Sequence, residues 1–261
     1  MTTAQQIVDH IEASVPLRWQ ERWDNSGWQV GDRRLEVTGI LLCVDVTEEV
    51  MDEAQERGCN MIIAHHPLIF TPLKRLMGES RVERCVMRAV RDQVAIYSIH
   101  TNLDSSPVGI NYWLAQALGL INLEVLDPHP SEKGVGIGVV GDLPEAIPLE
   151  ALLAIIADKF RDTSIGYSVP THAAVQRIAI CGGSGGSLIS QAIAAGAEVL
   201  FTGEAKYSDY IDVQGALTLV TAGHFTTEEC MKELIFRVIK EKSSIFVPIL
   251  LSSTRNPITY I

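Results

Sequence analysis

The chain has 261 residues, and its 21 Lys and Arg residues against 32 Asp and Glu residues give a formal net charge of −11 at pH 7. This acidic balance, with no basic run anywhere, argues against a nucleic-acid-binding surface. The N-terminal sequence M-T-T-A-Q-Q lacks the features of a signal peptide, and no apolar run is long enough to span a bilayer, so we expect a cytosolic protein. We expect the five scattered cysteines to be buried, reduced thiols.

The first thirty residues predict a helix followed by an ordered turn. Apolar residues at helical spacing after Thr3 indicate a helix that ends by Pro16. The segment Glu21 to Gly31 then places turn-forming residues between Trp23 and Trp28. We favour a structural turn pinned by two aromatic rings over a substrate-facing loop at this position.

The most informative stretch is Met61 to Phe70, M-I-I-A-H-H-P-L-I-F, which follows a predicted strand (Val37 to Val44) and a predicted helix (Thr47 to Arg57). Its apolar run is typical of a buried strand, and two histidines fall at the end of that strand. In extended backbone the side chains of His65 and His66 would point to opposite faces, so we expect one ion for each histidine unless the chain turns there. The alternative is a pair of buried histidines with satisfied hydrogen bonds.

A second polar cluster, H-T-N-L-D from His100 to Asp104, also follows a predicted strand, Val94 to Ile99. A helix from Ser80 to about Asp92 precedes this strand, and a helix capped by Ser106 is predicted to run to Gly119. Because the carboxyl ends of parallel strands share one edge of an α/β sheet, we expect the two clusters to converge.

The segment Asp127 to Gly134 is the best linker candidate, which predicts an N-terminal lobe over 1–126 and a C-terminal lobe over 134–261. The second lobe alternates strands and helices like the first, with a helix predicted over Leu149 to Phe160. We therefore predict an α/β protein of two linked lobes with largely parallel sheets.

A weak internal repeat relates the two lobes. A constant offset of 138 aligns a strand, the stop of a helix and a second strand, namely Ile40 with Ile178, Gly58 with Gly196, and Ala64 with Thr202. A repeated β-α-β-α-β unit is one interpretation of this offset, although few residues are identical.

The last helix begins near G-H-F-T-T-E-E, Gly223 to Glu229, and Pro248 later marks an edge strand. His224 and Glu228 are four residues apart. They share one helix face if the helix begins early, and they lie beside its first turn if Thr226 is the cap. Either way the two side chains can meet.

Three strand ends thus offer three imidazoles and two carboxylates: His65, His66, Asp104, His224 and Glu228. This mixture suits zinc, iron or manganese better than calcium or magnesium. Five protein ligands are too many for one catalytic ion with an open position, and they suit two ions bridged by one carboxylate and a water. Such a pair would lower the pKa of the bridging water, which predicts hydrolytic chemistry. The alternative is a polar network in the core.

Other polar groups near these strand ends have alternative roles. His100 is a candidate metal-supporting partner or proton shuttle, or it shapes the H-T-N-L-D loop through a hydrogen bond. The loop Cys181 to Ser187, C-G-G-S-G-G-S, could present N–H groups to a phosphate, but we favour a close-packed turn. Glu204 and Lys206 end the strand that corresponds to the His-His strand.

The motifs W-D-N-S-G-W-Q-V-G, A-H-H-P-L-I-F, H-T-N-L-D, C-G-G-S-G-G, T-G-E and G-H-x-x-T-E occur in one order, and with them the chain closely resembles the Nif-three-like family of GTP cyclohydrolase I type 2 homologs. The resemblance implies two α/β lobes and a toroidal homohexamer. It also implies a pair of divalent metal ions held by the five residues above, with Glu228 as the bridge. Ser208 stands where some members have a histidine, and longer members carry an insert between the halves.

These observations favour a dinuclear metal-dependent hydrolase that opens the imidazole ring of a guanine nucleotide, with Glu228 and His100 as the catalytic candidates. A second hypothesis keeps the metal ions and changes the reaction to phosphoester or amide hydrolysis. A third is a non-enzymatic, metal-stabilised oligomer that binds a partner. We expect a small-molecule substrate, and neither nucleic acid nor a membrane as a partner.

Overall fold

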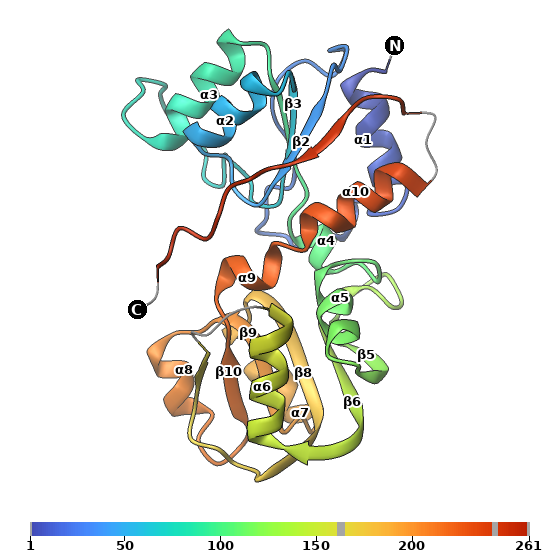
Figure 1. Ribbon diagram of the computed structural model, residues 1–261, viewed down its shortest axis with the longest axis vertical. Coiled ribbons are helices and arrows are strands. Elements are labelled where there is room, and N and C mark those ends of the chain that lie inside the picture. The colour runs from blue at the N-terminus through green and yellow to red at the C-terminus, as the bar shows by residue number, and fades with distance from the viewer. Residues whose placement is uncertain (1, 161–164, 242–244, 260–261) are drawn as a thin grey trace. The chain divides into compact units, whose positions relative to one another are not determined.

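The computed structural model describes residues 2–160, 165–241 and 245–259 (Figure 1). The chain divides into two compact units. Unit 1 comprises Met1–Leu103 and Met231–Arg255, and unit 2 comprises Asp104–Cys230 and Asn256–Ile261. Each unit contains one β-sheet and its own helices. The prediction of an α/β protein is therefore confirmed.

The sheet of unit 1 places its strands in the order β1 (Gly27–Val30), β4 (Ala95–Ser98), β3 (Met61–Ala64), β2 (Ile40–Cys43) and β11 (Ile249–Leu251). The last four run parallel, while β1 pairs antiparallel with β4. Every residue of β2, β3 and β4 is buried. Continuous apolar runs are what strands covered on both faces require, so the sequence pattern and the burial agree.

Helices cover both faces of the unit 1 sheet (Figure 1). One face is covered by α2 (Glu48–Glu56) and α3 (Arg81–Arg91), and the other by α1 (Ala4–Glu12) and α10 (Met231–Glu241), with a short 3-10 helix η1 (Leu17–Trp19) after α1. One residue from each of the three central strands, Leu41, Ile62 and Ile96, faces α2 and α3 in one buried cluster. The expected cap of α3 is present, because Oγ of Ser80 accepts a hydrogen bond from the backbone N–H of Glu83.

The sheet of unit 2 places its strands in the order β5 (Ile121–Pro128), β6 (Gly136–Pro148), β8 (Ala174–Ser184), β9 (Val199–Glu204), β10 (Thr218–Thr221) and β7 (Gly166–Tyr167). Parallel pairing joins β8 to β9 and β9 to β10, while β5 with β6, β6 with β8, and β10 with β7 pair antiparallel. The expectation of largely parallel sheets thus holds for unit 1, whereas unit 2 is mixed.

The helices of unit 2 also cover both faces of its sheet. They are α5 (Ile110–Ala117), α6 (Leu149–Phe160), η2 (Gly186–Leu188), α7 (Ile189–Ala194), α8 (Tyr207–Asp212) and α9 (His224–Glu228), and α4 (Thr101–Asp104) carries the chain from unit 1 into unit 2. Phe160 of α6 lies 6.2 Å from Trp113 of α5 and 5.5 Å from Phe201 of β9 between ring centroids, which joins both helices to one face. Ala192 of α7 packs with Leu200 in the cluster on the other face.

The parallel cores of the two sheets have matching register. Ile40 lies opposite Met61 in unit 1, and Ile178 lies opposite Val199 in unit 2, so both partners differ by the offset of 138. The helices before β3 and β9 are each followed by a glycine with positive φ, Gly58 at 70° and Gly196 at 72°. This left-handed position is one that glycine adopts without strain.

Several local expectations differ from the structure. The helix expected from Ser106 begins at Ile110, because the Ser106 carbonyl accepts from the backbone N–H of Gly109 in a turn and Gly109 becomes the N-cap. The linker candidate Asp127 to Gly134 is a hairpin loop, since Pro128 at one end pairs with Gly136 just beyond the other.

The unit boundaries also differ from the expected lobes 1–126 and 134–261. Residues 104–126 belong to unit 2, and Met231–Arg255 returns to unit 1 because β11 pairs with β2. The five cysteines are buried thiols, as expected. Within the described ranges, none of the helices has the length and apolar character needed to cross a membrane.

Candidate metal centre

His65 is fully buried directly after β3, and its ring orientation is fixed by the backbone. Its Nδ1 lies 2.9 Å from the carbonyl oxygen of Ile99, which can only accept a hydrogen bond. Nδ1 therefore carries the proton, and the lone pair of the neutral ring is on Nε2. The carbonyl of His65 in turn accepts a hydrogen bond of 2.8 Å from Oγ of Ser98. The residue is thus held in the tautomer that a metal ligand needs.

His66 has an equivalent arrangement with a carboxylate as the acceptor. Its Nδ1 lies 2.9 Å from Oδ1 of Asp45, a residue that follows β2. A carboxylate that accepts from Nδ1 fixes the ring and increases the basicity of Nε2. Asp45 was not predicted from the sequence. Like the predicted ligands, Asp45 lies just beyond the end of a buried strand, and this position could have identified it.

His65 and His66 lie side by side instead of diverging, which is the outcome expected if the chain turns there. Their ring centroids are 5.0 Å apart with an interplanar angle of 46°. The reason is local, because β3 ends at Ala64 and the chain bends at both histidines before Pro67. The alternation of side chains applies only while the backbone remains extended.

His100 completes a cluster of three histidines in unit 1. One ring nitrogen from each of His65, His66 and His100 can be chosen so that all three lie within 4.8 Å of one another, a spacing that could hold a metal ion. The ring centroids of His65 and His100 are 5.1 Å apart. Three imidazoles with their lone pairs available suit zinc or iron, so the donor set fits a borderline divalent ion.

Asp24 of the W-D-N-S-G turn holds His100 in place. The Asp24 side chain is fully buried, and its Oδ1 lies 2.7 Å from Nδ1 of His100. Burial raises the pKa of Asp24, but hydrogen bonding and charge interaction with His100, together with hydrogen bonds from Thr101 and Ser26, outweigh burial and hold this pKa well below its usual range. The turn before β1 therefore orients a histidine of the cluster.

In unit 2, His224 and Glu228 lie one turn apart on α9 and meet. Nε2 of His224 is 3.0 Å from Oε2 of Glu228, and its Nδ1 is 3.3 Å from Oε1 of Glu204 at the end of β9. Gly223, with φ of 84°, is the N-cap, so the helix begins early and places the two residues on one face. Glu228 is buried and His224 is partly exposed.

The glycine-rich loop is a close-packed turn against α9, which was the favoured interpretation. The backbone N–H of Gly183 donates to Oγ1 of Thr227 at 3.0 Å. A Cβ atom at position 183 would overlap Oε1 of Glu228 and lie 3.2 Å from Nε2 of His224. Gly203 is restricted in the same way, because its Cβ would lie 2.5 Å from Oγ1 of Thr227.

Asp104 belongs to the same neighbourhood of unit 2. Asn111 links the Asp104 segment to the glycine-rich loop, donating from Nδ2 to the Asp104 carbonyl at 2.9 Å and accepting from the N–H of Gly182 at 2.8 Å. Burial raises the pKa of the Cys181 thiol, and the charges of Asp104 and Glu228 raise it further. Both carboxylates are therefore close enough to act on one buried sulfur atom.

The predicted ligands therefore form two sets, one in each unit. Unit 1 carries His65 and His66, which the structure joins with His100. Unit 2 carries Asp104, His224 and Glu228 around the glycine-rich loop. The imidazoles of the first set and the imidazole and carboxylates of the second are the donors that zinc, iron and manganese prefer.

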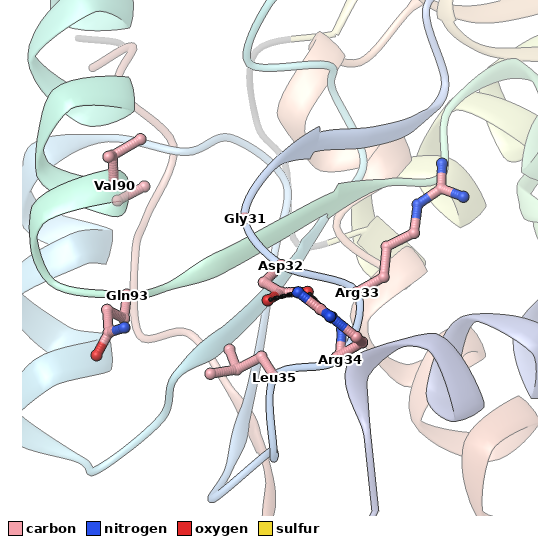
Figure 2. Close-up of a pocket in the computed structure, with 8 residues that line it drawn as sticks. Gly31, Asp32, Arg33, Arg34, Leu35, Val90 and Gln93 are labelled. Atoms are coloured by element: carbon pink, nitrogen blue, oxygen red, sulfur yellow. Dashed lines mark hydrogen bonds and ion pairs between the residues drawn. The ribbon is translucent and has the colours of Figure 1, made fainter.

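A cavity of about 840 Å³ in unit 1 lies elsewhere (Figure 2). It is lined by the turn from Gly31 to Leu35 and by the end of α3 with the residues after it. Figure 2 shows Arg34 paired with Asp32. Their closest charged atoms are 3.3 Å apart. A Cβ at Gly31 would lie 2.7 Å from the Cα of Ala95, the first residue of β4. His100 follows the opposite end of that strand, so the cavity is separate from the histidine cluster.

Comparisons with known proteins identify the family of the chain. It is 30% identical over 259 residues to the GTP cyclohydrolase 1 type 2 homolog of Clostridium perfringens, with 98% of each chain covered. It is 37% identical over 226 residues to the protein of the same name in Nostoc, covering 81% of this chain and 85% of that one. A crystal structure of the Staphylococcus aureus hypothetical protein SA1388 superposes with a TM-score of 0.91 at 28% identity over 99% of both chains. The model of the Duf34/NIF3 (NGG1p interacting factor 3) family matches residues 2–257, and the chain belongs to this family.

Proposed function

We propose that the protein is a metal-dependent hydrolase that opens the imidazole ring of a guanine nucleotide. The observation that carries the proposal is the cluster of His65, His66 and His100, in which the Nδ1 atom of every ring is held by an oxygen acceptor. Histidines that ligate metals are typically fixed in this way. The names of the relatives as GTP cyclohydrolase 1 type 2 homologs support the choice of substrate.

The proposed centre holds two divalent ions per chain, zinc, iron or manganese. His65 and His66 of unit 1 and Asp104, His224 and Glu228 of unit 2 would hold the ions. The burial of Glu228 supports this role, because a buried carboxylate needs a positively charged partner to offset the cost of its desolvation. A pair of bound ions supplies Lewis acidity and lowers the pKa of water.

The residues of the chain supply orientation and proton transfer. Addition of water to C8 of guanine requires a base that takes up a proton and an acid that returns one to the ring nitrogen when the C–N bond breaks. His100 is suited to both steps, because Asp24 holds the proton on Nδ1 and leaves the lone pair on Nε2. The charged Asp24 also stabilises the imidazolium that forms when Nε2 takes up a proton.

The test measures metal content first and turnover second. Elemental analysis of protein purified without added metal should give about two ions per chain, and His65→Ala should lose most of them, while His129→Ala, in the hairpin loop, should retain them. The metal-loaded protein should then release formate or a ring-opened product from GTP. No ions in native or reconstituted protein would overturn the proposal. Two ions with no reaction of GTP, but turnover of a phosphoester or amide, would change the substrate class and leave the centre in place.

We also propose that the protein acts as a cytosolic homohexamer on a small molecule. The support for the hexamer is the family resemblance carried by the sequence motifs, and the five buried thiols are typical of a reducing compartment. Light scattering coupled to size exclusion should give a mass near six times 28.6 kDa. A monomeric mass at all concentrations would contradict the hexamer.

A further inference from the structure

Two exposed aromatic side chains stand beside the histidine cluster of unit 1. Trp23 is 61% exposed and Phe70 is 51% exposed, and their ring centroids are 6.1 Å apart. The centroid of His100 lies 6.1 Å from that of Trp23 and 6.4 Å from that of Phe70. Both rings therefore combine contact with the histidine proposed to transfer protons and exposure to solvent. We call Trp23 and Phe70 the aromatic pair.

Hydrogen bonds hold the residues that flank the aromatic pair in both segments. Next to Trp23, the Asp24 side chain is anchored in the hydrogen bonds that orient His100. Next to Phe70, Ile69 is bonded twice to the other segment. Its carbonyl accepts from Nδ2 of Asn25 at 2.6 Å, and its N–H donates to Oε1 of Gln29 at 3.0 Å. The two segments are thus joined, and the exposed rings are presented by a fixed scaffold.

Trp28, the second tryptophan of the same motif, packs against a neighbouring strand and differs in this from the exposed Trp23. Trp28 lies in β1 and packs edge-on against the buried Tyr97, with centroids 5.7 Å apart. The exposure of Trp23 has no corresponding structural explanation, because an apolar ring left in water forgoes the free energy that its burial would provide.

We propose that Trp23 and Phe70 form a stacking site for the purine ring of the substrate. This rests on the proposed function for the identity of the ring. Stacking on aromatic side chains is a general way to bind a nucleobase, because every base has a π-face. The size of the pair favours one flat ring over a protein partner, because two half-exposed aromatic side chains offer on the order of 200 Å², whereas a stable protein interface needs about 800 Å² from each side. The position beside His100 sets the bound ring next to the group proposed to move its proton.

The test uses 7-deaza-GMP as the probe, because its five-membered ring lacks N7 and is not opened. Binding to the metal-loaded protein is measured by calorimetry for the wild type, Trp23→Ala, Phe70→Ala and Trp23→Phe. Ribose 5-phosphate, which carries the sugar and phosphate without the base, is the second probe. Val90→Ala is the matched control variant, since Val90 is an apolar residue of unit 1 that is 65% exposed and lies on α3. Metal content and particle mass are measured on every sample.

We expect each alanine variant of the pair to weaken binding of 7-deaza-GMP by about 5- to 100-fold, which is the range for loss of one base–aromatic stack. Trp23→Phe should recover most of the affinity, and binding of ribose 5-phosphate should be the same in all variants. Val90→Ala should bind 7-deaza-GMP like the wild type.

Unchanged binding of 7-deaza-GMP by Trp23→Ala would overturn the proposal. A smaller particle for Trp23→Ala with unaltered nucleotide affinity would also overturn it and would identify the pair as an interface between copies of the chain. If Trp23-dependent binding is found in protein that never retains metal, the stacking site stands and the proposed hydrolase fails. If the protein holds two ions per chain but Trp23 does not affect binding, the stacking site fails and the metal centre stands.

Discussion

Gly183 and Glu228 are packed so closely that no side chain fits at position 183. The φ angle of Gly183 is 62°, and a Cβ atom there would overlap the carboxylate oxygen Oε1 of Glu228. The carboxylate is therefore positioned by the backbone of the glycine-rich loop. Two separate restrictions, the left-handed conformation and the close approach, act on one residue.

Gly183→Ala should destabilise the protein and displace Glu228. Gly196→Ala is the control, because Gly196 shares the positive φ of 72° but has no described atom within 4 Å of its Cβ position. We expect a loss of about 1–2 kcal/mol in the free energy of unfolding for the control, from backbone strain alone, and a loss larger by about 1–3 kcal/mol for Gly183→Ala, from overpacking. Urea unfolding measures both. Equal losses would show that the loop yields without moving Glu228.

Asp45→Asn should weaken metal binding without unfolding the protein. The Asp45 carboxylate lies 2.9 Å from Nδ1 of His66, and loss of such a partner typically lowers metal affinity about 10- to 100-fold. Competition with a chromogenic chelator measures the affinity. Asp32→Asn serves as the control, because Asp32 pairs with Arg34 on the surface. An affinity unchanged in Asp45→Asn would argue against His66 as a ligand.

Asn111→Ala should lower stability by about 1–3 kcal/mol, which is the cost of leaving buried polar groups without partners. The residue is 1% exposed and connects the Asp104 carbonyl with the N–H of Gly182. The substitution should also reduce metal content, because it removes the link between the Asp104 segment and the loop beside Glu228. Thermal unfolding and elemental analysis of the same sample test both expectations. Ser190→Ala, which removes an exposed contact with Gln191 on α7, should change neither.

Stability on the acid side should depend on Glu53. Burial raises the pKa of Glu53, but hydrogen bonds from Ser252, the N–H of Ser253 and Arg57 outweigh it, and the pKa is lowered on folding. A carboxyl whose pKa is lowered stabilises the folded state above its unfolded pKa of about 4.3, and this stabilisation is lost as the pH falls through the folded value. Glu53→Gln should therefore reduce stability near pH 7 by about 1 kcal/mol or less and flatten its decline below pH 5.

The pH test is a series of urea unfolding experiments from pH 3 to pH 7. The wild type and Glu53→Gln should converge at the acid end, where both side chains are neutral. A constant difference in the free energy of unfolding across this range would show that the charge of Glu53 contributes nothing. Glu56→Gln, at the last residue of α2, provides an exposed carboxylate for comparison.

Strand-end reasoning located the polar residues of both units, because a buried apolar run followed by His65 and His66, or by His100, is visible in sequence. It left two outcomes open where backbone geometry changes within one or two residues. The bend after Ala64 brings the two histidine rings together, whereas a strand continued through them would have separated the rings. Asp24 and Asp45 were missed as histidine partners because a single aspartate in a turn has no distinctive spacing.

The sequence also could not predict which strands pair over long distances in the chain. The sequence indicates an edge strand near Pro248, but local pattern carries no information about which sheet it joins. The pairing of Leu250 with Leu41 is what assigns the segment to unit 1. In the same way, Asp127 to Gly134 has the composition of a linker or of a hairpin loop, and only the pairing of Pro128 with Gly136 distinguishes them.

The return of Met231–Arg255 to unit 1 has a consequence for biosynthesis. Residues 104–230 are synthesised before the last strand of unit 1. Unit 2 can therefore complete its sheet while β2 of unit 1 still has an unpaired edge. During translation the first hundred residues must therefore wait, with an open strand edge, for a segment more than a hundred codons downstream. Chaperone contact in the cell should concentrate on that interval.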